Sequence, residues 1–125
     1  MNSTQQAVSA YGKENTHLRT HRGIEAEVFA QVTRAITLAS GDKKHGFPKL
    51  AAALHSNRRL WRALAFDVSN AENALPADMR ARVFYLSEFV NEQTGKVLRG
   101  DATVDALREV NMSIMRGLNM EATST

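Results

Sequence analysis

The sequence predicts an all-α protein, a single-domain helical bundle of four main helices plus a short N-terminal helix. Apolar residues recur at spacings of three and four along most of the chain, which is the period of an amphipathic helix. The two prolines fall between these periodic segments rather than within them. The period-two alternation that is typical of a half-buried strand is absent.

The first part of the chain predicts a short helix, a connector and a longer helix. The short helix is expected over Ser3–Tyr11, with a hydroxyl side chain capping its start and Gly12 ending it. The polar stretch Lys13–Arg22 is interpreted as a connector. The next helix is expected over Gly23–Ala39, with an apolar stripe formed by Ile24, Val28, Val32, Ile36 and Ala39.

The third helix is expected to follow the loop Ser40–Gly46. Phe47-Pro48 opens this helix, because proline suits a first turn in which its missing N–H would be unpaired anyway. Its stripe consists of Leu50, Leu54, Asn57, Trp61, Leu64 and Val68.

A fourth helix is expected to start at Pro76 after the break Asn70–Leu75, with the stripe Met79, Val83, Leu86 and Val90. This helix ends either near Gly95 or at Gly100, and the sequence does not decide between these two C-terminal ends. Asp101 is expected to cap a fifth helix with the stripe Val104, Leu107, Asn111, Ile114 and Leu118. Residues 1–125 thus form one domain with a core of about 3–118 and a frayed tail at 119–125.

Composition narrows the class of protein. The chain has no cysteine, which excludes disulfides and thiolate metal sites. It shows no secretory signal at its start and no apolar run near the roughly 20 residues that span a bilayer, so we expect a cytoplasmic protein without a membrane partner.

The charge is unevenly distributed. Residues 1–62 hold 10 Lys/Arg and 4 Asp/Glu, whereas residues 63–125 hold 6 and 9. A basic half is one signature of nucleic-acid binding, which makes an RNA-binding regulator the alternative function. The basic residues are scattered rather than arranged in a stripe with aromatics, and this argues against nucleic acid as the partner.

No motif for catalysis is present. The chain lacks a glycine-rich phosphate loop, a His-Glu-x-x-His pair and an EF-hand loop. His17 and His21 would share a helical face, but a closed metal site needs three or four ligands, so we interpret them as exposed histidines. We expect no enzyme activity, no cofactor, no metal and no small-molecule substrate.

Two asparagines interrupt otherwise apolar stripes. If Asn57 or Asn111 were buried without a hydrogen bond, the free energy of unfolding would fall by about 1–3 kcal/mol for each. We therefore predict that each bonds across the core, to backbone or to the other asparagine. The alternative is that one of the stripes faces a partner.

Several aromatic and arginine side chains are candidates for binding a protein. Trp61, the single tryptophan, follows Arg58 and is either a core anchor or part of an interface. Phe84 and Tyr85 lie off the apolar stripe of their helix. For Phe89, as for these two, the sequence does not show whether the side chain is in the core or at an interface. Either that helix is buried on two sides or it presents a surface to a partner.

These residues carry a resemblance to a known family. The pattern resembles that of the FlaF family of flagellar biosynthesis regulators in alphaproteobacteria, and it extends from about Ala7 to Leu118. The stretches that match are Leu54-x-x-Asn57-Arg58-Arg59-Leu60-Trp61, Asn73-x-Leu75-Pro76-x-x-Met79-Arg80-Ala81, Phe89-Val90 and Val110-Asn111-x-x-Ile114-x-x-Gly117-Leu118.

The resemblance implies a protein of flagellar assembly that is not an enzyme. Such proteins promote flagellin production and bind flagellin as an export chaperone, so flagellin is the implied partner, with other flagellar regulators as further partners. Trp61, Arg58, Phe84, Tyr85 and Phe89 are then candidates to line a groove for flagellin. Asn57, Asn73 and Asn111 are expected to hold the bundle together as its structural polar residues.

Overall fold

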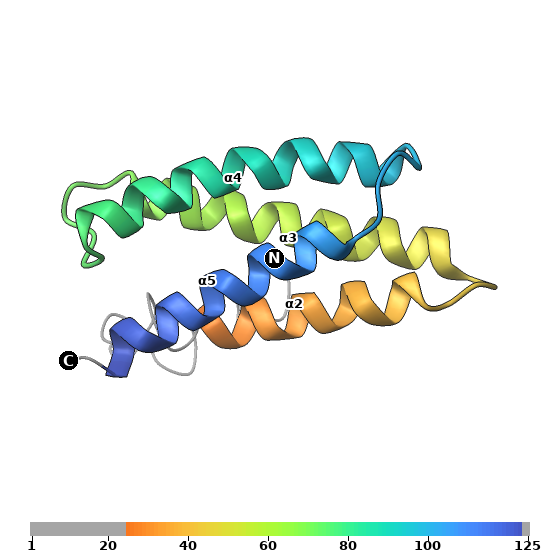
Figure 1. Cartoon of the computed structure of the whole chain (residues 1–125), viewed down its shortest axis with the longest axis horizontal. Helices are drawn as coiled ribbons and strands as arrows, with labels where there is room; N and C mark the ends of the chain where they lie inside the picture. The colour runs from red at the N-terminus through yellow and green to blue at the C-terminus, as the bar shows by residue number, and fades with distance from the viewer. Residues whose placement is uncertain (1–24, 124–125) are drawn as a thin grey trace.

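Four helices follow one another in antiparallel order (Figure 1). The computed structural model describes residues 25–123, with α2 over Glu25–Ser40, α3 over Gly46–Val68, α4 over Ala77–Leu98 and α5 over Asp105–Thr123. No strand occurs within this range, so the all-α class and the four main helices are confirmed. The predicted helix Ser3–Tyr11 and the connector Lys13–Arg22 lie outside the described residues.

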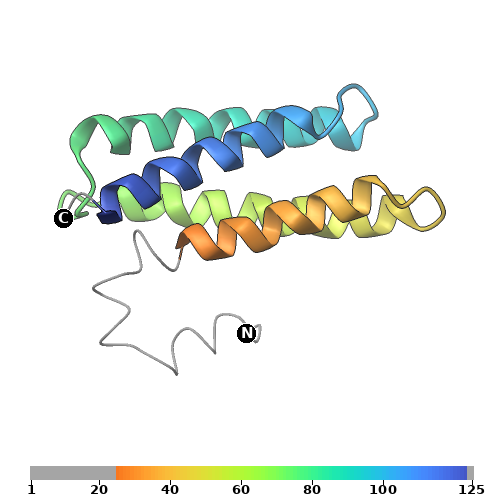
Figure 2. The ribbon, with the colours of Figure 1, turned by 60° about the horizontal axis from the view of Figure 1, so that its bottom comes forward.

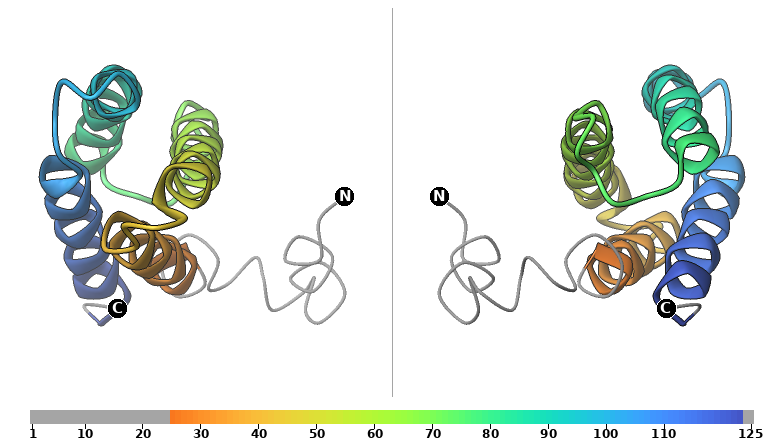
Figure 3. Two further views of the ribbon diagram at one scale, coloured as in Figure 1. Left: turned by 90° about the vertical axis from the view of Figure 1, so that its right-hand side faces the viewer. Right: turned by 90° about the vertical axis from the view of Figure 1, so that its left-hand side faces the viewer.

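Each helix packs against two others. α2 contacts α3 and α5, and α4 contacts the same two helices. Figure 2 shows α5 between α4 and α2, and the views along the bundle in Figure 3 show the four helices around a common centre. The turns α2–α3 and α4–α5 lie at one end of the bundle, and the turn α3–α4 lies at the other (Figure 1).

The buried face of α2 differs from the predicted stripe. Phe29 and Thr33 are buried, whereas Val28 and Val32 are only half-buried. The core face is therefore displaced by one residue in the first part of α2, whereas Ile36 and Ala39 of the predicted stripe are buried as predicted. The reason is tertiary: Phe29 packs edge-on against Trp61, with ring centroids 5.2 Å apart.

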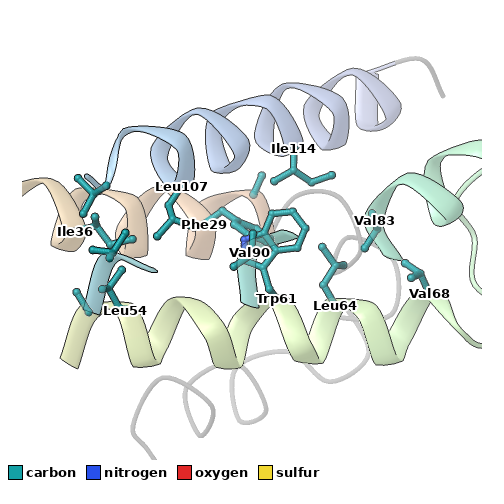
Figure 4. Packing of buried hydrophobic residues seen from close by; sticks show 14 of the residues in the cluster. Phe29, Ile36, Leu54, Trp61, Leu64, Val68, Val83, Val90, Leu107 and Ile114 are labelled. Carbon is teal, nitrogen blue, oxygen red and sulfur yellow. The ribbon is translucent and has the colours of Figure 1, made fainter. Parts of the chain in front are cut away.

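The other helices bury faces close to those predicted. α3 buries the whole predicted stripe except Leu50, which is half-buried. α4 adds two buried residues toward its C-terminal end, which the predicted stripe lacked. The fully enclosed side chains include Leu54, Trp61, Val68, Val83, Val90, Leu107 and Ile114 (Figure 4).

A glycine motif ends α4. Gly100 has a φ of 82°, a left-handed conformation that glycine adopts without steric cost. Its N–H donates to the Val97 carbonyl at 3.0 Å, and the Asp101 N–H donates to the Lys96 carbonyl at 2.8 Å. These two bonds satisfy helix-end carbonyls in a Schellman motif, so α4 passes through Gly95 and stops at Leu98.

The same motif corrects the predicted start of α5. Asp101 does not cap α5, because its N–H belongs to the end of α4 and the helix begins later, at Asp105. The Asp105 N–H donates to the Thr103 hydroxyl at 3.3 Å, and the Val104 carbonyl accepts the N–H of Arg108 at 3.0 Å. At its other end α5 continues to Thr123, past the predicted end at Leu118.

The turn before α3 is organised by a carboxylate. Asp42 Oδ1 accepts the N–H groups of Lys44 and His45 at 3.1 and 2.9 Å, and its Oδ2 accepts Lys49 Nζ at 3.0 Å. The His45 N–H, followed by the bond from Lys49, holds the pKa of Asp42 below its ordinary value of 3.8. The ionised side chain therefore stabilises the folded turn.

Gly100→Ala is predicted to lower the free energy of unfolding by about 1 kcal/mol, because alanine resists a left-handed conformation. Gly41→Ala is the control. Gly41 lies in a turn without positive φ, and a Cβ there would stand 3.7 Å from its nearest neighbour, the Thr37 carbonyl oxygen, which is an ordinary contact. Urea unfolding measures both variants. An equal loss for the two would contradict a special requirement at position 100.

Asp42→Ala is predicted to lose stability in a pH-dependent way. Because the pKa of Asp42 is depressed in the folded state, its contribution is fully present above the ordinary value and is lost as pH falls through the lowered pKa. The difference in unfolding free energy between the wild type and Asp42→Ala should shrink as the pH is taken from 7 to about 2.5. A difference that stays constant over this range would show that the carboxylate charge is not the cause.

Candidate functional site

A cavity of about 370 Å³ opens on the seam between α3 and α4. Side chains of both helices line it, namely Arg58, Trp61 and Arg62 from α3 and Ser87, Glu88, Val90 and Asn91 from α4. Two of these, Trp61 and Val90, are buried and belong to the apolar core. The cavity is thus lined by five charged or polar side chains together with two apolar side chains of the core.

Trp61 is a core residue rather than an exposed anchor. Only 1% of its surface is accessible, and Figure 4 shows its ring within the cluster that also holds Phe29 and Val90. The indole Nε1 donates to Asn111 Oδ1 at 2.8 Å, which fixes the ring from its polar side. Of the two alternatives that the sequence left open, the structure shows Trp61 as a core residue, one edge of which also lines the cavity.

Asn111 is the centre of a buried polar network. Besides accepting from Trp61, its Nδ2 donates to Asn57 Oδ1 at 2.8 Å and to Thr33 Oγ1 at 2.9 Å. The Thr33 hydroxyl in turn donates to the Phe29 carbonyl at 2.7 Å. These bonds connect α2, α3 and α5 through one side chain. Both asparagines are completely buried, and they meet each other in the core.

Two polar residues depart from what the sequence indicated. Asn73 does not join this network but organises the loop between α3 and α4, where its Oδ1 accepts the Leu75 N–H at 2.9 Å. Thr33 belongs to the network although no pattern in the sequence distinguishes it. Its neighbours Val28 and Val32 fit a helical stripe equally well, so only the position of Asn111 identifies it.

Arg58 crosses the seam from α3 to α4. Its Nη2 donates to the Asn91 carbonyl at 2.9 Å, and its buried Nε has no hydrogen-bond partner among the described residues. The guanidinium is therefore held by a neutral acceptor, and no ion pair within residues 25–123 compensates its charge.

The aromatic candidates on α4 fall on different faces. Phe84 is 45% exposed and precedes the cavity residues Ser87 and Glu88 by three and four positions, so it lies on the cavity side of the helix. Tyr85 is 70% exposed and Phe89 is half-buried. These two are four residues apart, share another face of α4 and do not line the cavity.

Phe66 is an exposed aromatic residue that the sequence analysis did not select. It is 80% exposed and follows the cavity residue Arg62 by four positions on α3. Because α3 and α4 are antiparallel and contact each other, Phe66 and Phe84 both lie on the side of the cavity that is nearer to the turn joining these helices, although neither ring lines the cavity itself. We call this surface, formed by Arg58, Arg62, Glu88, Phe66 and Phe84, the α3–α4 groove.

Other kinds of site find no support in the part of the chain that the structure describes. Within residues 25–123 no three His, Asp or Glu side chains are grouped to hold a metal ion, and His17 and His21 lie outside this range. The helices described here include none that is both long and apolar enough to cross a bilayer.

Asn111→Ala is predicted to cost more stability than Asn57→Ala, by about 1–2 kcal/mol. Both replace a completely buried asparagine, so the loss of packing is matched. Asn111 makes three side-chain hydrogen bonds in the core, whereas Asn57 makes one and already has an unpaired Nδ2. Chemical denaturation measures the difference. Equal losses would mean that the network adds nothing beyond packing.

Comparison with known proteins places the chain in a family. The model of a family described as "Flagellar protein FlaF" matches residues 7–118, which include α2, α3, α4 and the buried face of α5. No curated protein and no solved structure matches. Because the match extends over almost the whole sequence and confirms the resemblance of its motifs, this protein belongs to the FlaF family of flagellar proteins.

Proposed function

We propose that this protein binds flagellin in the cytoplasm as a secretion chaperone and promotes flagellin synthesis and export for flagellum assembly. Its membership of the FlaF family supports the flagellar setting. In this proposal the protein acts by binding and catalyses no reaction.

The observation that carries the proposal is the pair of exposed phenylalanines beside the cavity. Phe66 and Phe84 leave large apolar surfaces in water, one next to the cavity residue Arg62 on α3 and the other next to Glu88 on α4. Full burial of a phenylalanine side chain is worth about 1.5–3 kcal/mol, so covering these two rings favours binding of an apolar partner. Aromatic side chains beside arginines are also the composition that is enriched at energetically important interface positions.

Flagellin suits such a surface for a physical reason. Its terminal segments are disordered before assembly and become amphipathic helices in the filament. A helix with one apolar face fits the seam between two antiparallel helices in the helix-in-groove mode of recognition. Covering that face before export would prevent premature association of flagellin, although ordering the segment costs part of the gain.

The experiment is co-purification of the full chain with full-length flagellin and with flagellin that lacks either terminus. It is carried out at low and high salt, with and without RNase. Binding that resists salt and RNase and requires one terminus supports the proposal. Failure to bind flagellin contradicts it, and recovery of RNA instead would favour the alternative of a messenger-RNA regulator, whose phosphate contacts weaken with salt.

Phe66→Ser is predicted to weaken flagellin binding about tenfold, which corresponds to about 1.4 kcal/mol of lost apolar burial. Tyr85→Ser is the matched control, because Tyr85 is similarly exposed but lies on another face of α4. Calorimetry or fluorescence anisotropy measures both affinities. The reverse order of effects would move the contact to the face that Tyr85 shares with Phe89.

A further inference from the structure

The α3–α4 groove is chemically polarised along its length. Phe66 and Phe84 lie toward the turn between the two helices, whereas Arg62 and Arg58 follow at one and two helical turns before Phe66 on α3. At 1.5 Å per residue, the arginines lie about 6 and 12 Å from Phe66 along the helix axis. One end of the groove is therefore apolar and the next part is basic.

The arginines are not neutralised within the described structure. Arg58 has one hydrogen bond to a backbone carbonyl and an unpartnered, buried Nε. Arg62 is exposed, and no carboxylate of residues 25–123 lies within salt-bridge distance of either guanidinium. Among the described residues, Glu88 is the only acidic one that lines the cavity, and it forms no ion pair with either arginine.

An unneutralised guanidinium beside an apolar surface is suited to a carboxylate. Arginine presents several N–H donors in a planar arrangement that matches a carboxylate, and such charge-assisted bonds are stronger than neutral ones. Trp61 and Val90 below the arginines reduce the exposure to water of a ligand in the cavity. This strengthens an ion pair relative to one at an open surface.

We propose that the α3–α4 groove selects a helical segment by the order of two of its side chains. An apolar side chain of the segment contacts Phe66 and Phe84, and a carboxylate of the segment pairs with Arg58 and Arg62. The matching residues on the bound helix are separated by about four to eight positions, because its rise per residue equals that of α3. Their order fixes the direction in which the segment lies. This inference rests on the proposed function, in that the segment belongs to flagellin.

The test measures the affinity of full-length flagellin for the wild type, Arg62→Glu and Arg82→Glu as a function of salt. Arg82 is the control, since it is an exposed arginine of α4 that does not line the cavity and lies on the side of its helix opposite to Asn91. We expect Arg62→Glu to weaken binding about tenfold and to reduce its salt dependence, and Arg82→Glu to change the affinity less than about twofold. Glu88→Gln should tighten binding, because it removes the only acidic side chain of the cavity lining.

The outcomes separate the two proposals. If the wild type binds flagellin and the two arginine variants bind equally well, or are weakened equally, the arginine selection is overturned and flagellin binding stands. If the wild type does not bind flagellin, the proposed function fails, and this inference fails with it. Thermal unfolding of each variant accompanies the test, and an unchanged midpoint assigns any loss of affinity to the groove.

Discussion

The arrangement of the bundle depends on the side chain of Asn111. A completely buried amide must be hydrogen-bonded, and this one is satisfied by Trp61, Asn57 and Thr33. Since these partners come from α3 and α2, the amide of α5 fixes the rotation of three helices at once. A helix turned by one residue would leave several buried polar atoms unpaired, whereas apolar contacts alone tolerate such a change. The network thus selects one packing among several that would bury similar apolar area.

The fourth helix is held in a different way. α4 packs on the core through Val83, Val90 and Val97, and none of its side chains takes part in the Asn111 network. Its polar links to α3 include Arg58 to the Asn91 carbonyl and Arg80 to the Val68 carbonyl. The cavity lies on this seam. The side of the molecule that we propose for binding therefore adjoins the helix that the buried network does not fix.

Family membership and geometry contribute different parts of the functional argument. The FlaF match supplies the flagellar setting. The geometry supplies a cavity between α3 and α4, two exposed phenylalanines next to it and two arginines that form no ion pair within residues 25–123. The proposed chaperone would use both features, recognising the charge of an amphipathic segment as well as its apolar face. A purely apolar groove would accept many helices, whereas a required ion pair restricts the choice.

The sequence by itself determined the helices, because their apolar period and helix breakers are local properties. It also indicated that Asn57 and Asn111 bond within the core, since a buried amide demands a partner. The sequence did not determine where α4 ends and α5 begins, because Asp101 fits both the residue after a helix-ending glycine and the residue that caps a new helix. Only the tertiary structure decided that Phe29 rather than Val28 faces the core, that Trp61 is enclosed, and that Phe66 and Phe84 share a groove. Each of these depends on which helices become neighbours, and the spacing of residues along a single helix carries no information about that.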